Sequence, residues 1–276
     1  MKTGLNHAAS DARASPQPVG DALAELVAAL CRMIAQGLSR KSDRHGGVHR
    51  ARKAIRSVRA ILALTGDALN DEAADIDRSL QQLARGLSAL RDAHVAVATA
   101  QSLATDHGKQ TWLDVTARLR MHSEHLLADA LARDPAFSAR RARLTKLAKA
   151  LAALPWHRVK HESLHGELAR SELRVAKAER KAKAAMSPAA VHRWRRRMRR
   201  LRMQVDAMGR IEICHESLRA MQGERIRELK KRTDLLGRRQ DLEVLKRLLP
   251  KVSDAADLVT LRRRLQQEIA DLDGAG

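Results

Sequence analysis

A basic segment that occurs twice constrains the fold of this chain more than any other feature. Residues 48–59 read VHRARKAIRSVR, and residues 191–202 read VHRWRRRMRRLR, 143 positions later. A second pair follows in the same order, with LSALRDAHV at residues 87–95 and LGRRQDLEV at residues 236–244. Two motifs that recur in order at similar offsets predict two related halves, with a seam near Leu154 and Pro155.

The repeated segment has the spacing of an α-helix with two faces. At about 100° per residue, cations line one side and apolar residues line the adjacent face. The first basic stripe contains His49, Arg52, Lys53, Arg56 and Arg59, beside Val48, Ala51, Ile55, Val58 and Leu62. The second contains His192, Arg195, Arg196, Arg199 and Arg202, with Arg200 next to it, beside Val191, Trp194, Met198, Leu201 and Val205. Acidic partners four positions away are missing from both stripes, so we expect the stripes to bind an anion.

Apolar residues at helical spacing continue through almost the whole chain after Asp21, and no convincing strand pattern interrupts them. Breaks rich in Gly, Pro and Asp predict helices over residues 21–40, 47–65, 71–106, 111–133, 137–153, 156–185, 189–210, 215–249 and 254–272. Ser187 and Pro188 are typical of a helix N-cap and first helical position. The predicted fold class is all-α. We expect a flexible tail over 1–19 and one domain over 20–273, with a first half over 20–154 and a second over 155–273.

The large positive charge of the chain predicts a polyanionic partner. Its 276 residues include 53 Lys plus Arg against 32 Asp plus Glu, a formal charge of +21. Nucleic acid, an anionic membrane surface or a phosphate polymer would relieve the resulting self-repulsion. The aromatic residues are Trp112, Trp156, Trp194 and Phe137, with no Tyr, so a base-stacking platform is hard to build. This composition favours a partner recognised through its phosphates.

The two cysteines, Cys31 and Cys214, fit no disulfide framework and no CxxC pattern, so we expect small core residues of a reduced compartment. The N-terminus lacks an apolar signal-peptide core, and no stretch of 18 apolar residues predicts a membrane span. We therefore expect a cytoplasmic protein. Its basic stripes also lack the bulky apolar backing of an interfacial helix, which weakens a membrane-surface role.

At the two stripes the chain resembles the CHAD family, the conserved histidine α-helical domain, over residues 20 to 272. The family pattern, His followed by Arg or Lys at +3, +7 and +10, matches His49, Arg52, Arg56 and Arg59, and again His192, Arg195, Arg199 and Arg202. The second copy also has a basic residue at +8, Arg200, where the first has Ser57. Leu229 and Lys230, residues 234–237 and Asp241 resemble a further family motif, from which Arg232 and Thr233 depart.

The resemblance implies two pseudo-symmetric four-helix-bundle halves of antiparallel helices, whose basic helices line a central cleft or pore. It also implies binding of inorganic polyphosphate and association with polyphosphate granules. The 137–153 helix has no clear place in this four-plus-four arrangement. The chain lacks the Glu-x-Glu-x-Lys signature of triphosphate tunnel enzymes, so we expect a stand-alone CHAD protein.

The main alternative to an anion-binding protein is a metal-binding protein. Residues 161–165 read HESLH and fit the HExxH motif, which on a helix places two histidines beside zinc. A zinc protease also needs a third ligand and an edge strand for its substrate, and the sequence predicts no strand. We therefore interpret the match as a coincidence, with adventitious metal binding left open. Asp92 and Asp241 invite a catalytic interpretation too, but we expect them to orient Arg side chains of the neighbouring basic helix or to support helix packing.

These observations predict a non-catalytic protein that binds inorganic polyphosphate without a cofactor or metal. The alternative is a basic helical protein that binds nucleic acid, because phosphate contacts alone give non-specific affinity. The protein partners are not predicted. The predicted polyphosphate-binding residues are His49, Arg52, Lys53, Arg56, Arg59, His192, Arg195, Arg196, Arg199, Arg200, Arg202 and Lys230.

Overall fold

The computed structural model describes residues 18–105, 108–185, 187–211 and 216–274, and in these ranges the chain is helical, without strands. The all-α prediction is therefore confirmed. The helices are α1 (Val19–Ser39), α2 (Arg44–Leu62), α3 (Asn70–Arg85), α4 (Ser88–Ser102), α5 (Lys109–Arg133), α6 (Ser138–Ala153), α7 (His161–Ala185), α8 (Pro188–Ile211), α9 (Glu216–Leu248) and α10 (Ala255–Gly274). Short 3₁₀ helices cover Gly66–Leu69, Pro135–Phe137, Trp156–Arg158 and Leu249–Lys251.

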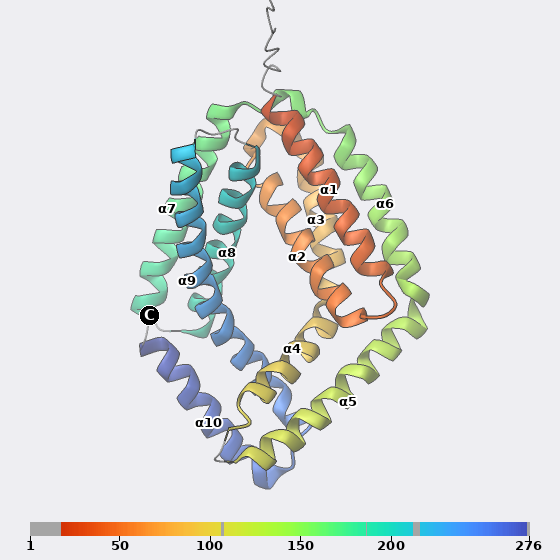
Figure 1. Ribbon diagram of the computed structural model, residues 1–276, viewed down its shortest axis with the longest axis vertical. Helices are drawn as coiled ribbons and strands as arrows, with labels where there is room; N and C mark the ends of the chain where they lie inside the picture. The colour runs from red at the N-terminus through yellow and green to blue at the C-terminus, as the bar shows by residue number, and fades with distance from the viewer. Residues whose placement is uncertain (1–17, 106–107, 186, 212–215, 275–276) are drawn as a thin grey trace, which may run out of the picture.

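The helices form an elongated ring (Figure 1). One side holds α1, α2, α3 and α6, and the other holds α7, α8 and the first part of α9, while α4, α5, α10 and the end of α9 close the lower tip. A large apolar cluster reaches from α1 to α9 and includes Ile34, Ile55 and Met198. A smaller cluster joins the end of α4 and the start of α5 to α9 and α10, through residues such as Leu119 and Leu245. Both cores therefore combine residues from before and after Leu154.

The predicted apolar faces of the two basic helices enter this core. In α2 the residues Val48, Ala51, Ile55, Val58 and Leu62 are all buried. In α8 the residues Met198, Leu201 and Val205 are buried, whereas Val191 and Trp194 are only half-buried. The difference arises because the first turns of α8 lie nearer the solvent, where the Arg232 guanidinium stands 5.9 Å from the centre of the Trp194 ring.

Local sequence signals located the N-terminus of α8 correctly but misplaced that of α2. Ser187 caps α8 as predicted, with its Oγ accepting a hydrogen bond from the Ala190 amide at 3.3 Å. The start of α2 was predicted at residue 47 but lies at Arg44. The Asp43 carboxylate accepts a 2.7 Å hydrogen bond from the Gly46 amide, so Asp43 is the cap and the glycine pair lies inside the helix.

Other boundaries differ from prediction. The single helix expected over 71–106 is two helices, because the chain turns at Gly86 and Leu87, where a fully buried Leu87 anchors the turn in the core. The helix expected over 156–185 begins only at His161, after the 3₁₀ turn that holds the buried Trp156. The tail was expected to extend to residue 19, but Val19 already belongs to α1, and residues 1–17 lie outside the described ranges.

The helix without a clear place in the family arrangement is α6. It packs against α1 and α3 on the outer side of the first half, so it extends that bundle. It begins after Ala136 and Phe137, both of which have positive φ values, 52° and 54°. The Phe137 side chain is buried there, so core packing holds an unfavourable backbone conformation.

One described helix, α1, is long and apolar enough to cross a membrane by length and composition alone, which corrects the expectation that no such stretch exists. A core helix of a bundle passes the same test, and Leu23, Ile34 and Leu38 of α1 are fully buried in the protein. Two glycines bring α1 close to α2. A Cβ atom on either Gly37 or Gly47 would collide with the other residue's carbonyl oxygen, so the contact depends on both.

Candidate anion-binding site

The two basic helices pack against each other, α2 from one side of the ring and α8 from the other. Between them lies a cavity of about 510 Å³, which we call the basic pocket. Its charged and polar lining consists of Arg56, Arg59, His192, Arg193, Arg196, Arg197, Arg199 and Arg200. Residues far apart in the sequence, such as Arg56 and Arg193, thus share one continuous basic surface.

The centre of this surface is a cluster of guanidinium groups that repel one another. Burial and the charges of neighbouring arginines lower the pKa of both Arg56 and Arg199, most strongly for Arg199. Burial likewise lowers the pKa of Arg195, against the opposing attraction of Asp241. Guanidinium groups stay protonated at neutral pH. The lowered pKa values therefore mean that the free protein keeps these arginines charged at an energetic cost. An anion in the pocket would remove that cost.

Hydrogen bonding at the cluster is also incomplete. Arg195 is only 9% exposed, and its Nε has no hydrogen-bond partner among the described residues, nor does the buried Nε of Arg56. In the same ranges, Arg56, Arg195 and Arg199 form no ion pair with a carboxylate. Buried charged donors without partners are strongly destabilising, and anions supply the oxygens that they need.

The other arginines of α2 are held by the protein itself. Arg59 forms a bidentate pair with Asp77 of α3, at 2.7 Å and 2.9 Å. Arg52 donates to the Ala84 carbonyl oxygen and to Ser88 Oγ, the latter at 2.9 Å, at the junction of α3 and α4. The acidic partner that is missing within the stripe therefore comes, for Arg59, from a neighbouring helix, which spacing along one helix could not reveal.

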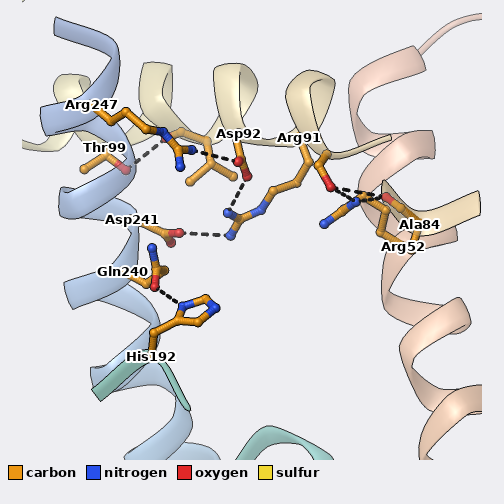
Figure 2. Close-up of polar contacts among 11 residues, drawn as sticks. Arg52, Ala84, Arg91, Asp92, Thr99, His192, Gln240, Asp241 and Arg247 are labelled. Atoms are coloured by element: carbon orange, nitrogen blue, oxygen red, sulfur yellow. Dashed lines mark hydrogen bonds and ion pairs between the residues drawn. The ribbon is translucent and has the colours of Figure 1, made fainter. Parts of the chain in front are cut away.

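The two repeated aspartates meet beside the basic pocket (Figure 2). Arg91 of α4 donates to Asp92 at 3.2 Å and to Asp241 of α9 at 2.9 Å, and Arg247 donates to Asp92 at 3.1 Å. The aspartates thus orient arginines, as predicted, but those of α4 and α9 rather than of α2 and α8. Arg91 was missed because it lies outside both stripes, although the second repeated motif contains it.

Each stripe begins with a histidine, and the two histidines have different neighbours. His192 Nδ1 lies 2.5 Å from Gln240 Oε1, and Gln240 occupies in the second copy the position that Arg91 occupies in the first. For His49, burial and the positive charges of Arg56, Arg91 and Lys53 lower the pKa. His49 is therefore neutral at pH 7, when no anion is bound.

Six of the twelve predicted residues do not line the basic pocket: His49, Arg52, Lys53, Arg195, Arg202 and Lys230. Three of these six line another cavity. Lys53, Arg202 and Lys230 line a second cavity of about 500 Å³, which we call the mixed groove. Its lining consists of Leu26, Leu30, Met33, Arg50, Lys53, Ala54, Ser57, Ile61, Arg202, Met203, Asp206, Ala207, Arg210, Ile226 and Lys230. Only Met203 also lines the basic pocket. The structure therefore divides the predicted site between two surfaces of different chemistry.

Two pocket residues, Arg193 and Arg197, were not predicted. Both lie one position beyond a stripe residue on α8, and Arg197 donates to the Arg174 carbonyl oxygen at 3.0 Å. The density of arginine in this segment was the available signal. On the other side, Asp67, Asp71 and Asp77 line a neighbouring cavity of about 650 Å³ together with Arg59 and Arg200. This acidic wall bounds the basic surface on the α3 side.

The HExxH residues lie in the first turn of α7. The rings of His161 and His165 are 4.5 Å apart, and both residues are exposed. Among the described residues, no group of three His, Cys, Asp or Glu side chains could hold a metal ion. Cys31 is buried and unbonded, and burial raises its pKa to about 11, whereas Cys214 lies outside the described ranges.

Comparisons with known proteins agree with this architecture. The model of the CHAD domain family matches residues 21–250. The crystal structure of the CHAD domain from the plant Ricinus communis is similar, with a TM-score of 0.65 and 22% sequence identity. That similarity covers 93% of this chain and 90% of the plant chain, and at this identity it shows a shared fold. A comparison with curated protein sequences finds no match.

Proposed function

The chain belongs to the CHAD family, a family associated with polyphosphate binding, and we propose that it binds inorganic polyphosphate in the basic pocket without transforming it. The observation that carries the proposal is a guanidinium cluster without carboxylate partners among the described residues: Arg56 and Arg199 line the basic pocket, and the buried Arg195 belongs to the same cluster but not to the lining. Planar guanidinium groups match phosphate oxygens, and a polymer presents one anionic unit after another to such a surface.

We propose further that the two helical halves are pseudo-symmetric and that each contributes one basic helix to a central cleft. The recurrence of the two sequence motifs supports this arrangement, as does the packing of α2 against α8. A polymer bound there would contact both halves at once. Because each contact adds to a single binding event, affinity should rise with chain length until the cleft is filled.

The proposed function includes no catalytic step. Asp92 and Asp241, whose charges act on Arg195, are engaged by Arg91, and Arg247 also binds Asp92. Metal-assisted attack on a phosphate chain requires carboxylates that are available to a divalent ion. We therefore propose a reader of the polymer, located in the cytoplasm at polyphosphate granules, which a fluorescent fusion imaged with a polyphosphate stain would test.

Nucleic acid is the second candidate, and the formal charge of +21 favours it. The lining of the basic pocket contains no Trp, Phe or Tyr ring for a base to stack on, so binding to nucleic acid would involve mainly phosphates. Such binding should weaken steeply as salt rises and should show no sequence preference.

Calorimetric titration with long-chain polyphosphate at near-physiological salt distinguishes the polyphosphate-binding function from the nucleic-acid-binding function. Double-stranded DNA at matched phosphate concentration is the competitor, and the polymer is sized afterwards. We expect polyphosphate to bind despite the DNA and to keep its length. Equal affinity for both polymers would favour the nucleic-acid alternative, and shortened polymer would contradict the non-catalytic proposal.

A further inference from the structure

The mixed groove differs chemically from the basic pocket. Its walls come from four helices: α1 contributes only apolar side chains, whereas α2, α8 and α9 each contribute both apolar and basic ones. Met33, which is 47% exposed, lines this groove together with the half-buried Leu26 and Ile226. A polyphosphate chain has no apolar part to cover these side chains, so it would leave them in contact with water.

The cations at the groove are not equally engaged. Arg50 pairs with Asp43 at 3.1 Å, Arg210 with Asp206 at 3.2 Å, and Lys230 with Asp234 at 3.0 Å. Lys53 and Arg202, in contrast, form no ion pair with any described residue. These two side chains come from α2 and α8, respectively, and both line the groove. An anionic head group therefore has two available cations beside an apolar surface.

We propose that the mixed groove binds an amphipathic anion, a molecule with one alkyl chain and a phosphate or carboxylate head. The head group pairs with Lys53 and Arg202, and the alkyl chain covers Leu26, Met33 and Ile226. The volume of about 500 Å³ lies within the range of small-molecule sites. This ligand class is distinct from the polymer proposed for the basic pocket, and the two sites share only Met203.

The occupant is a dissolved single molecule rather than a membrane surface. A bilayer is bound by apolar side chains that project from a helix into the lipid. Here the apolar side chains line a concavity between four helices, where a flat surface cannot reach them all. An alkyl chain can enter the concavity and bury its own surface against them.

The test is calorimetric binding of dodecyl phosphate, kept below its micelle-forming concentration, to the full-length protein. Inorganic phosphate and a neutral dodecyl glycoside each supply half of the ligand's chemistry, and we expect both to bind at least about tenfold more weakly. Equal binding of inorganic phosphate would overturn the proposal, as would binding confined to vesicles of anionic phospholipid.

Two sets of variants locate the site. Met33→Asp replaces an apolar contact of the alkyl chain with a charged carboxylate, and we expect about tenfold weaker dodecyl phosphate binding. Met121→Asp is the matched control, because Met121 is 66% exposed on α5 and lines neither cavity. The double variant Lys53→Gln and Arg202→Gln should lose the preference for dodecyl phosphate over the neutral glycoside.

Circular dichroism of each variant checks the fold, and Met33→Gln provides a milder change at the same position. Polyphosphate binding by Met33→Asp should match that of the unmodified chain, which separates this proposal from the function of the basic pocket. An unchanged affinity for dodecyl phosphate in both Met33 variants would contradict the proposal even if polyphosphate binding were intact.

Discussion

The helices α2 and α8 carry the same basic motif, yet the protein uses their arginines differently. In α2, Arg52 and Arg59 are engaged by Ala84, Ser88 and Asp77 on adjacent helices. In α8, Arg195, Arg196 and Arg199 form no ion pair with any described carboxylate. Arg56 is the exception in α2, because it points into the same cluster as the arginines of α8. The comparison assigns a largely structural role to one copy and a largely ligand-binding role to the other.

This difference shows why a repeated motif does not imply repeated function at each position. A guanidinium group is available to a ligand only if no neighbouring carboxylate or carbonyl oxygen already accepts its hydrogen bonds. For Arg59 the neighbour is Asp77, on α3. The environment that each helix meets, rather than its own spacing, decides which cations remain available.

The largest expected effect is on polyphosphate affinity, when arginines of α8 are removed and the result is compared with removal of arginines from α2. We expect Arg196→Gln with Arg199→Gln to weaken long-chain polyphosphate binding about 100-fold, since each lost charge-assisted contact reduces affinity about tenfold. The thermal midpoint should hold or rise, because like charges are removed. The matched α2 pair, Arg52→Gln with Arg59→Gln, should lower the midpoint and weaken binding less. Calorimetry and thermal unfolding measure both, and equal loss of affinity in the two pairs would refute the distinction.

A smaller effect is expected at the link between α4 and α9. Asp241→Ala removes the shorter of the two carboxylate contacts of Arg91 and leaves this half-buried cation with Asp92 alone, so the free energy of unfolding should fall by about 1–2 kcal/mol. Urea denaturation measures this change. Asp254→Ala is the control, because its pair with Arg118 is exposed and should contribute less than about 1 kcal/mol. Equal loss in the two variants would show that the link has no special role.

A modest increase in polyphosphate affinity is expected from a substitution that releases an arginine of α2, as the clustered arginines of α8 already are. Asp77→Asn weakens the bidentate pair with Arg59 and frees this guanidinium, which lines the basic pocket, for an anion. We expect polyphosphate affinity to rise about threefold and the free energy of unfolding to fall by about 1 kcal/mol. Asp75→Asn, an exposed residue on the same helix, should change neither quantity. Weaker polymer binding by Asp77→Asn would mean that the pair positions Arg59 for the ligand.

The smallest effect concerns the histidine at the head of the α2 stripe. Burial and nearby cations lower the pKa of His49 from its usual 6.5, so as the pH falls below 6.5 the unfolded chain takes up the proton first. Stability should therefore decline between pH 6.5 and the lowered pKa, and His49→Gln should flatten this decline. Polyphosphate would raise the pKa by neutralising the cations, so its affinity should increase on acidification. Urea titrations at several pH values check the first trend, and an unchanged slope in His49→Gln would reject it.

Much of the fold could be predicted, because helix formation depends on local spacing. The buried stripe of Val48, Ile55 and Val58 and the Ser187 cap are both explicit in the sequence. The turn at Gly86 and Leu87 was missed because its apolar periodicity continues almost unbroken from α3 into α4. Only the burial of Leu87 between elements reveals why the chain turns there.

The sequence by itself determined the helical class, the two basic helices and the excess of phosphate-binding side chains, since these follow from periodicity and charge. Tertiary structure decided which cations face one another, because α2 and α8 meet only after the chain has closed into a ring. It brought Arg91 between Asp92 and Asp241, satisfied Arg59 with Asp77, and separated Lys53 and Arg202 from the basic pocket. Electrostatic and hydrogen-bonding energies depend on distances through space, and those distances exist only in the folded chain.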